Sequence, residues 1–538
     1  MNTFNCAYGQ KVIVVIYVDD TTIRQWLEMR AKEEPDAVFC IYEDTPITYG
    51  EIEKKVNRLA NGFIKLGFQR GDRVAIMIPN HPDFFFMVFA CAKVGLTYIP
   101  LNTNLKGANL DLLLQLSDPR ALLVDESFAD ILTESLGRSG LNNIEYIFTR
   151  GHADFAKTGI ARQIPFPSVG EDSESTPPDV PGAGPEDVLA ISYTSGTTGI
   201  PKGVLLTDRM LRACAKGAAI ANEAGPGEVM LMWESFCHIG GVQMICVCLI
   251  YRSIMALLPR FSASRFWDQA RHYKATRVHY LGSVLPILLK QPPRADDRNH
   301  SVKIAWGAGA SRQIWKEFEN RFGVQIHEAY GMTECSSLTT VCLDGKIGSI
   351  GKPLPYFEVR IMGENGKVAP YGELGEIQVR AKQPGLILKG YFRNPDATNK
   401  CILSDGWFAT GDLAYMDEEG YIFFKGRSKD SLRINGENVS AWEVERIINE
   451  YPDIEECAVI GVPGELGGDD MKVFIKCASC GDKPNPSDIA KWCEPRMAKY
   501  QIPRYYAFID EFEKTESQRT KKNDLSRSIY DCWDRNAK

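Results

Sequence analysis

One short stretch of the sequence, YTSGTTGIPKGV at residues 193–204, has the side chains needed to bind phosphate. It combines three glycines, four aliphatic hydroxyl residues and one lysine directly after the apolar run VLAIS. Backbone N–H groups and hydroxyls in such a loop can donate to phosphate oxygens, and Gly196 and Gly199 let the backbone approach closely. Lys202 can reach the outer phosphates as a point charge. Because Gly203 follows the lysine where a Walker A loop has Ser or Thr, we expect a nucleotide loop of another type. The motif alone is also compatible with an ordinary Gly/Thr turn.

Two carboxylates follow apolar segments further along the chain. Glu334 ends the stretch VQIHEAYGMTE, in which residues 324–328 are expected to form a strand that leads into a loop. Ligands of open α/β sheets bind beyond the carboxyl ends of the strands. Asp412 follows Thr410 and Gly411 in an expected turn, and a carboxylate there can accept hydrogen bonds from both ribose hydroxyls. Taken alone, each position is also typical of a surface acid in a loop or turn.

The segments around these residues alternate between strand and helix patterns. Residues 46–66 begin with a turn and then place apolar residues at helical spacing, namely Ile52, Val56, Leu59 and Phe63. A strand (DRVAIMI), a helix (FFFMVFACAKVG) and further strands (TYIPL, ALLVD, IEYIF, KIAWGAGA) follow. This alternation predicts an α/β fold, with a large N-terminal domain of stacked, mainly parallel sheets with helices and a small α+β C-terminal domain.

We expect three segments along the chain: an N-terminal extension at 1–24, a large domain at 25–426 and a small domain at 427–538. The polar stretch GRSKD at 426–430 marks the second boundary. The extension contains KVIVVIYV, which is too short to span a bilayer because a spanning helix needs about 20 apolar residues. We therefore expect an edge strand or a disordered extension there, and no transmembrane segment.

Charge and cysteine usage restrict the partners and the location. The formal net charge of −7 provides no large basic field, so we expect no nucleic-acid partner. The 15 cysteines are odd in number and scattered through a long chain, unlike the disulfide framework of a short secreted protein. This usage favours a reducing, cytoplasmic location.

Five further motifs accompany the phosphate loop in a fixed order: TYGEI at 48–52, GAG at 307–309, YGMTE at 330–334, GWFATGDLAYMDEEGYIFFKGR at 406–427 and INGENVSAWEVE at 434–445. Together with YTSGTTGIPKG they resemble the acyl-adenylate-forming superfamily, which includes acyl-CoA synthetases, luciferases and the adenylation domains of peptide synthetases. The resemblance covers roughly residues 25–525. It implies that ATP and a carboxylic acid form an acyl adenylate with Mg²⁺ present, that pyrophosphate leaves, and that a mobile small domain then presents a thiol.

The resemblance also assigns roles to individual residues. Tyr330 is expected to stack on adenine, Thr333 to contact phosphate and Glu334 to hold Mg²⁺, which prefers oxygen ligands. Arg427 is the expected second contact to the ribose. The ATP-binding residues implied in this way are Thr194, Ser195, Gly196, Thr197, Gly199, Glu328, Ala329, Tyr330, Gly331, Met332, Thr333, Asp412 and Arg427. The catalytic residues implied are Thr198, Lys202, Glu334 and Arg519.

Three further groups follow from the same resemblance. His238, in FCHIGG, aligns with a family histidine beside the acyl pocket, and Gly307, Ala308 and Gly309 would lie between adenine and the acyl chain. Lys429 holds the hinge position. The residues expected to line the path of coenzyme A are Arg433, Gly436, Glu437 and Asn438. Each group is also compatible with a structural role, as a packed histidine, a tight turn or a polar surface turn.

The C-terminal motif departs from the family pattern. The family usually has Ser/Thr-Gly-Lys shortly before a leucine, whereas this chain has EKTESQRTKKNDL. Alignment on Leu525 places Arg519 at the lysine position, with Lys521 and Lys522 just beyond. Because arginine replaces a compact ammonium with a planar fork, three alternatives stay open. Arg519 acts in place of the lysine, a shifted Lys521 or Lys522 acts, or adenylation is slow.

We expect an ATP-dependent acyl-CoA ligase that uses free coenzyme A, because LGGDD at 466–470 lacks the attachment serine of a carrier protein. One alternative is an adenylating enzyme that loads a separate carrier protein. Another is a catalytically impaired nucleotide-binding homologue, which only Arg519 favours. Residues 264–293 resemble the carnitine/crotonobetaine-CoA ligase branch. Trp233 and Glu234 would suit a trimethylammonium group, although packing explains them better. The sequence does not define the acid.

Overall fold

The computed structural model describes residues 2–5, 11–14, 17–139, 143–152, 155, 158–160, 162–194, 201–282, 284–427, 431–434, 437–463, 469–478, 483–497, 499–514 and 520–537. The chain divides into two compact units, Met1–Glu358 with Arg380–Gly406, and Val359–Val379 with Trp407–Lys538. The domain boundaries expected after residues 24 and 426 stay predictions.

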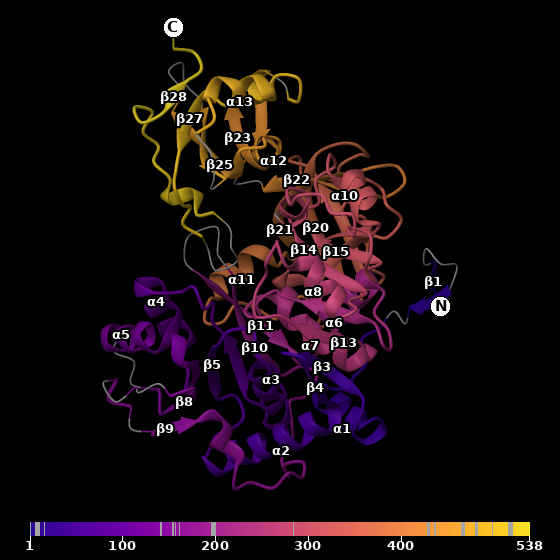
Figure 1. Cartoon of the computed structure of the whole chain (residues 1–538), viewed down its shortest axis with the longest axis vertical. Coiled ribbons are helices and arrows are strands. Elements are labelled where there is room, and N and C mark those ends of the chain that lie inside the picture. The colour runs from indigo at the N-terminus through magenta and orange to yellow at the C-terminus, as the bar shows by residue number, and fades with distance from the viewer. Residues whose placement is uncertain are drawn as a thin grey trace. The chain divides into compact units, whose positions relative to one another are not determined.

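The first unit contains a seven-stranded sheet in the order β11-β10-β6-β5-β7-β8-β9. Figure 1 labels β11, β10, β5, β8 and β9 of this sheet. Its strands are β5 (Arg73–Met77), β6 (Thr97–Pro100), β7 (Ala121–Asp125), β8 (Tyr146–Arg150), β9 (Arg162–Pro165), β10 (Val188–Thr194) and β11 (Lys202–Thr207). All neighbours are parallel except β11, which returns antiparallel to β10. Strand β7 is buried along its whole length, as expected for a parallel sheet covered on both faces.

A nine-stranded sheet in the order β18-β17-β16-β15-β14-β12-β13-β3-β4 completes the first unit. Its strands are β3 (Val38–Tyr42), β4 (Thr45–Thr48), β12 (Val229–Met232), β13 (Ile254–Leu257), β14 (Arg277–Leu281), β15 (Ile304–Ala308), β16 (Gln325–Met332), β17 (Ser337–Cys342) and β18 (Lys352–Pro353). Pairing is parallel from β16 through to β3 and antiparallel only at the two edges. The parallel centre places the carboxyl ends of β14, β15 and β16 at one edge of the sheet.

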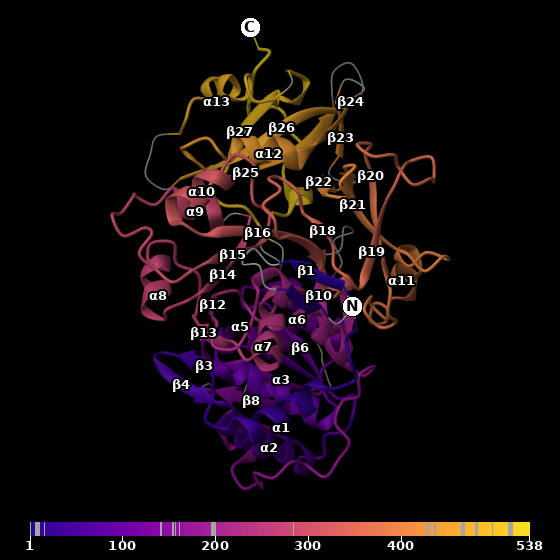
Figure 2. The same ribbon diagram turned by 90° about the vertical axis from the view of Figure 1, so that its right-hand side faces the viewer.

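Helices cover both faces of each sheet. They are α1 (Ile23–Glu33), α2 (Tyr49–Lys65), α3 (Pro82–Val94), α4 (Gly107–Ser117), α5 (Ala129–Ser139), α6 (Asp208–Asn222), α7 (Ile239–Tyr251), α8 (Phe266–His272), α9 (Val284–Leu289), α10 (Trp315–Phe322) and α11 (Pro395–Cys401). Helices α4 and α5 pack on the face of the seven-stranded sheet that Ile147 presents, whereas Phe148 contacts Phe63 of α2 from the other face. Helices α8, α9 and α10 lie together on one face of the nine-stranded sheet (Figure 2).

Helix α2 shows how local sequence sets these elements. Its first turn carries a capping box, in which the Thr48 side chain accepts from the Glu51 N–H and the Glu51 carboxylate accepts from the Thr48 N–H. All four residues of the predicted helical stripe, Ile52, Val56, Leu59 and Phe63, are at most 4% exposed. The predicted helix is confirmed, whereas the turn predicted before it is wrong, because Thr45–Thr48 form strand β4. Helix α3 is buried all round, so it is a core helix rather than an amphipathic one.

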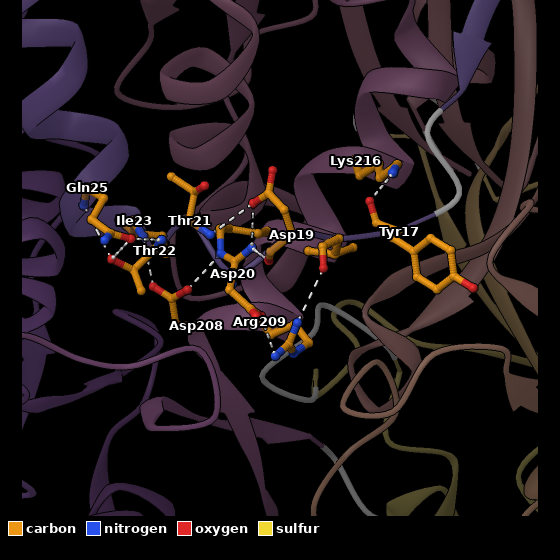
Figure 3. Close-up of polar contacts among 12 residues, drawn as sticks. Tyr17, Asp19, Asp20, Thr21, Thr22, Ile23, Gln25, Asp208, Arg209 and Lys216 are labelled. Atoms are coloured by element: carbon orange, nitrogen blue, oxygen red, sulfur yellow. Dashed lines mark hydrogen bonds and ion pairs between the residues drawn. The ribbon is translucent and has the colours of Figure 1, made fainter. Parts of the chain in front are cut away.

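The start of the first unit is fixed on α6 (Figure 3). Strands β1 (Asn2–Asn5) and β2 (Lys11–Val14) pair antiparallel with each other. Further on, the carbonyl of Tyr17 accepts from Nζ of Lys216 at 2.8 Å, Asp20 pairs with Arg209 at 2.8 Å, and the Ile23 N–H donates to Asp208 at 2.9 Å. Burial lowers the pKa of Lys216 to about 8. Residues 17–23 are therefore part of the folded unit.

In its described residues, the second unit combines three small sheets with two α-helices. Its strands are β19 (Phe357–Met362), β20 (Gly375–Ala381), β21 (Phe408–Met416), β22 (Ile422–Arg427), β23 (Ser431–Ile434), β24 (Glu437–Ser440), β25 (Ile454–Pro463), β26 (Asp469–Cys477), β27 (Tyr505–Phe508) and β28 (Trp533–Asp534), and its helices are α12 (Ala441–Ile448) and α13 (Pro486–Cys493). Strands β19 to β22 form one sheet and β25 to β28 another, with β23 and β24 as a hairpin. Both helices pack into the core around β25 and β26. The predicted small α+β lobe is confirmed.

Candidate active site

The predicted phosphate loop connects the two strands of a hairpin. Strand β10 ends at Thr194 and β11 begins at Lys202, and these two residues pair directly across the ladder. The Thr194 hydroxyl donates to the Lys202 carbonyl at 3.5 Å. The hairpin therefore returns the lysine to the carboxyl end of β10. The other loop residues with predicted roles lie outside the described residues, namely Ser195, Gly196, Thr197, Thr198 and Gly199.

Glu334 follows β16 in a 3₁₀ turn, Thr333–Cys335. The strand is longer than predicted, since β16 runs to Met332 instead of ending at Glu328. Antiparallel pairing with β17 extends it, and Tyr330 pairs there with Thr340. Tyr330 is 7% exposed. The residues predicted to contact ATP, Ala329 to Thr333, therefore lie on the end of this strand and on the turn after it.

A segment distant in sequence connects Lys202 with Glu334. The Tyr391 hydroxyl donates to Oε1 of Glu334 at 2.9 Å, and Nζ of Lys202 lies 5.2 Å from the centre of the Tyr391 ring. Burial, together with the charge of Glu334, keeps the pKa of the Tyr391 hydroxyl far above its usual value, so it is a donor. The structure thus brings two predicted catalytic residues together on one tyrosine.

Cys401, at the end of α11, lies in the same cluster. Its Sγ donates to the Thr398 carbonyl at 3.3 Å, and burial together with the charge of Glu334 raises the pKa of its thiol. Sequence patterns identified neither Tyr391 nor Cys401. The stretch LKGYFRN gave no chemical signal, because the tyrosine acquires its partners only when the chain returns beside β11.

Glu328 has a different environment from the one that its predicted ATP-binding role suggests. Its carboxylate is fully buried and accepts from the N–H of Gly309 at 2.5 Å, from the N–H of Ala310 at 2.9 Å, and from the Tyr280 hydroxyl. Burial raises the pKa of Glu328 to about 7, and these three donors only partly oppose the rise. The side chain therefore fixes the turn after β15 from inside the sheet.

The GAG turn needs its glycines for packing. A Cβ on Gly307 would lie 1.9 Å from the carbonyl oxygen of Tyr280, and one on Gly309 would lie 2.9 Å from Cα of Gly282. Gly309 also has φ of 97°, in the region that favours glycine. Ala308 ends β15 between them. The turn predicted to lie between adenine and the acyl chain is thus a close approach of two strand ends.

His238 precedes α7 as its N-cap residue. Nearby, the buried Glu234 places Oε2 2.9 Å from Nδ1 of His279. Burial alone would raise the pKa of Glu234, but the charge and hydrogen bond of His279, with the charge of His238, lower it. Trp233 donates from Nε1 to the His279 carbonyl at 3.0 Å. These contacts agree with the packing role preferred for Trp233 and Glu234 over a trimethylammonium wall.

In the second unit, Asp412 and Arg427 face each other across β21 and β22. They are paired in register, and Nε of Arg427 lies 3.2 Å from Oδ1 of Asp412, which is 3% exposed. The turn predicted for Thr410 to Asp412 is wrong, because these residues lie inside β21. The Thr410 hydroxyl accepts from the Asp412 N–H at 3.1 Å and donates to the Ile377 carbonyl at 2.7 Å. Turn-like residues are tolerated there because this side-chain bonding and a local irregularity in the ladder accommodate them.

The two C-terminal lysines make ion pairs within the second unit. Nζ of Lys522 lies 2.7 Å from Glu445, whose carboxylate also accepts from the Val459 N–H at 2.6 Å. Nζ of Lys521 lies 3.5 Å from Glu513. Lys429, Gly436 and Arg519 lie outside the described residues. The backbones of Arg433, Glu437 and Asn438 lie on the β23–β24 hairpin, where Arg433 pairs with Asn438.

Two further properties concern metal binding and membrane insertion. Among the described residues, no three His, Cys, Asp or Glu side chains cluster so as to hold a metal ion by themselves. None of the helices in the described part of the chain has the length and apolar character needed to cross a bilayer.

Comparison with known proteins identifies the family. Two profiles match, AMP-binding enzyme over residues 27–392 and AMP-binding enzyme C-terminal domain over residues 443–519. The chain is 31% identical over 504 residues to crotonobetaine/carnitine–CoA ligase of Salmonella arizonae, which covers 90% of this chain and 94% of that protein.

Solved structures of proteins similar to this chain have a similar fold. The o-succinylbenzoate CoA synthetase of Bacillus subtilis with its acyl-adenylate intermediate has a TM-score of 0.80 and 26% identity, covering 93% of this chain and 97% of that one. The same enzyme with ATP and magnesium ion has a TM-score of 0.79 and 26% identity, covering 93% and 98%. The predicted α/β fold class and the family resemblance are confirmed. The chain therefore belongs to the AMP-binding enzyme family, the acyl-adenylate-forming superfamily that its motifs predict, and is an AMP-forming acid–thiol ligase.

Proposed function

We propose that this chain joins a carboxylic acid to coenzyme A in two steps. The acid first attacks the α-phosphate of ATP to give an acyl adenylate and pyrophosphate, and the thiol of coenzyme A then displaces AMP. The observation that supports this most is that Lys202 and Glu334 both contact Tyr391 beside the strands that flank the phosphate loop. Nζ of Lys202 lies 5.2 Å from the centre of the Tyr391 ring, and the Tyr391 hydroxyl lies 2.9 Å from Oε1 of Glu334. One cation and one carboxylate at a nucleotide loop suit a reaction that gathers negative charge.

The residues present fit Mg²⁺ bound together with the nucleotide. Within the described part of the chain, Oε2 of Glu334 has no hydrogen-bond donor, so a carboxylate oxygen is available to a hard cation. The lack of a three-ligand cluster among the described residues fits as well, since Mg²⁺ is usually held by one or two carboxylates together with substrate phosphates. When bound, the ion would neutralise phosphate charge.

The chain's own residues supply orientation and charge. Lys202 would offset the charge of the outer phosphates, and the hydroxyls and N–H groups of Thr194, Ser195, Gly196, Thr197, Thr198 and Gly199 would hold their oxygens. Tyr330 would stack on adenine. Asp412 would accept from the ribose hydroxyls, and Arg427, 3.2 Å from it, would fix the carboxylate in place. Glu328, Ala329, Gly331, Met332 and Thr333 would complete the nucleotide contacts, Glu328 by holding the turn that contains Gly309.

The acid and thiol sites are proposed from the same resemblance. His238 and the turn Gly307, Ala308 and Gly309 would border the acyl group. Lys429 would act as the hinge, and Arg433, Gly436, Glu437 and Asn438 would border coenzyme A. Of the three alternatives for the C-terminal cation, the ion pairs of Lys521 with Glu513 and of Lys522 with Glu445 argue against a shifted lysine, since both lysines already have partners. We propose that Arg519 acts in place of the lysine. The predicted domain boundaries and the predicted cytoplasmic location belong to this proposal.

The experiment that tests the function works without the acid being identified first. Purified protein is given ATP, Mg²⁺ and a panel of small carboxylic acids, and the release of AMP and of pyrophosphate is measured with and without coenzyme A. Release that depends on both an acid and coenzyme A supports the ligase. Acid-dependent pyrophosphate release that coenzyme A does not accelerate would instead indicate a separate carrier protein. No acid-dependent release from any panel member would indicate a catalytically impaired homologue.

A further inference from the structure

Tyr391 contacts both charged residues of the candidate nucleotide site, although it belongs to neither motif. Its hydroxyl bonds Oε1 of Glu334 at 2.9 Å, and its ring lies 5.2 Å from Nζ of Lys202. The side chain is 8% exposed. One rigid aromatic group therefore defines where a carboxylate and an ammonium lie relative to each other.

The backbone around Tyr391 is fixed at several points. The Phe392 N–H donates to the Gly203 carbonyl at 2.7 Å, and the Leu388 N–H donates to the Glu334 carbonyl at 2.7 Å. The Tyr391 N–H donates to the Thr398 hydroxyl at 2.9 Å. The segment is thus bonded to β11 on one side and to the turn of Glu334 on the other, so the ring has little freedom to move.

This arrangement affects the two charges differently. A hydrogen bond to a carboxylate is stronger than one between neutral groups, so the hydroxyl holds Oε1 and directs the remaining oxygen of Glu334 in one orientation. The electron-rich face of the ring attracts the Lys202 ammonium. Without the hydroxyl, Glu334 would be free to rotate toward the nearby ammonium and neutralise it, and both groups would be lost to the nucleotide.

We propose that Tyr391 is a positioning residue for adenylation, which orients Glu334 for a divalent cation bound with ATP and keeps Lys202 separate from it. The inference rests on the proposed function, because it assumes that ATP binds at this hairpin. Tyr391 itself would contact no reacting atom. It would act through Glu334 and Lys202, which would contact the nucleotide and its cation.

The test compares Tyr391→Phe, which removes one hydroxyl and keeps the ring, with a matched control. Tyr49→Phe also removes a buried tyrosine hydroxyl, one that donates to the Cys248 carbonyl at 2.9 Å in the same unit. ATP binding is measured by titration calorimetry over a series of Mg²⁺ concentrations. This readout needs neither the acid nor turnover. Melting temperatures without ligand check that each variant is folded.

We expect Tyr391→Phe to raise the Mg²⁺ concentration for half-maximal ATP binding about tenfold, the usual effect of one hydrogen bond to a charged group. Tyr49→Phe is expected to match the wild type. In a Glu334→Gln background, Tyr391→Phe should have no further effect on Mg²⁺ dependence, because the hydroxyl acts through that carboxylate. If Tyr391→Phe does not fold, Thr398→Ala removes the acceptor of the Tyr391 backbone N–H, loosens the segment that carries the ring and should shift Mg²⁺ dependence in the same direction.

Two results would overturn the inference, and they are distinguishable. Normal ATP binding by the wild type with unchanged Mg²⁺ dependence in Tyr391→Phe would remove the role of Tyr391 alone. Failure of the wild type to bind ATP at any Mg²⁺ concentration would remove the proposed function, and this inference with it.

Discussion

Glu328 offers a quantitative test of the packing described at the strand ends. The carboxyl is fully buried, and burial raises its pKa from an ordinary 4.5 to about 7. The folded protein therefore holds a proton that the unfolded chain releases between these two values. Stability contributed by this group is highest below pH 4.5 and falls as the pH rises to about 7. Over that pH interval the proton linkage lowers the free energy of unfolding by about 3 kcal/mol.

The perturbation is Glu328→Gln, which removes the titration. The amide oxygen, placed at the Oε2 position, can still accept from the Tyr280 hydroxyl and the Ala310 N–H. The amide nitrogen then faces the Gly309 N–H and cannot accept from it, so the variant carries a constant penalty at every pH. Tyr280 does not titrate in this range, because burial and the charge of Glu328 raise its pKa well above the usual value. Changes in all other groups cancel when the variant is compared with the wild type at each pH.

The assay is calorimetric melting of both proteins without ligand at pH 5, 6, 7 and 8. We expect the stability difference to move in favour of Glu328→Gln by about 2 to 3 kcal/mol between pH 5 and 8. A difference that stays constant would show that Glu328 titrates normally. A difference that moves against the variant would show that the three hydrogen-bond donors to Glu328 lower its pKa more than burial raises it. Either result would refute the raised pKa of Glu328.

Three other substitutions test the second unit. Asp412→Asn should weaken ATP binding about tenfold while reducing the discrimination against ATP analogues that lack ribose hydroxyls, because the amide forms weaker bonds than the anion; equal discrimination by variant and wild type, measured by calorimetry, would contradict the ribose role. Lys522→Ala should lower the stability of the unit by about 1 kcal/mol through loss of the 2.7 Å pair with Glu445 and leave pyrophosphate exchange intact. Arg519→Ala should slow that exchange at least about tenfold, and the opposite pattern would identify Lys522 as the acting cation.

Much of the fold was predictable because it depends on local patterns. The helical stripe and capping box of α2, the continuous apolar strands and the glycine-rich turns each specify their own geometry over a few residues. The antiparallel return of β11 was not predicted, since the alternation indicated mainly parallel sheets and the pairing of Thr194 with Lys202 is a tertiary choice. The end of β16 was missed for the same reason, because β17 extends it from outside.

The same distinction between local sequence patterns and tertiary contacts holds for the candidate site. The roles of Lys202, Glu334 and Asp412 stay predictions. These residues were predicted because their motifs resemble those of the family and their residue types suit nucleotide chemistry. Tyr391 and Tyr280 were not, because each becomes relevant only through a partner far away in the sequence, Glu334 and Glu328 respectively. The opposite error occurred at Thr410 to Asp412, where turn-forming residues lie within a strand because side-chain bonds compensate.

The most direct test of the central claim is carboxylate-dependent exchange of labelled pyrophosphate into ATP, measured for the wild type, Lys202→Met and Lys216→Met. Lys216 is a matched control, since it lies in the same unit and its ammonium bonds the Tyr17 carbonyl at 2.8 Å. We predict exchange by the wild type with at least one acid, a decrease of about a hundredfold in Lys202→Met, as for loss of one group that stabilises transition-state charge, and little change in Lys216→Met. Exchange that proceeds equally in both variants would contradict the assignment of this hairpin as the place where ATP reacts.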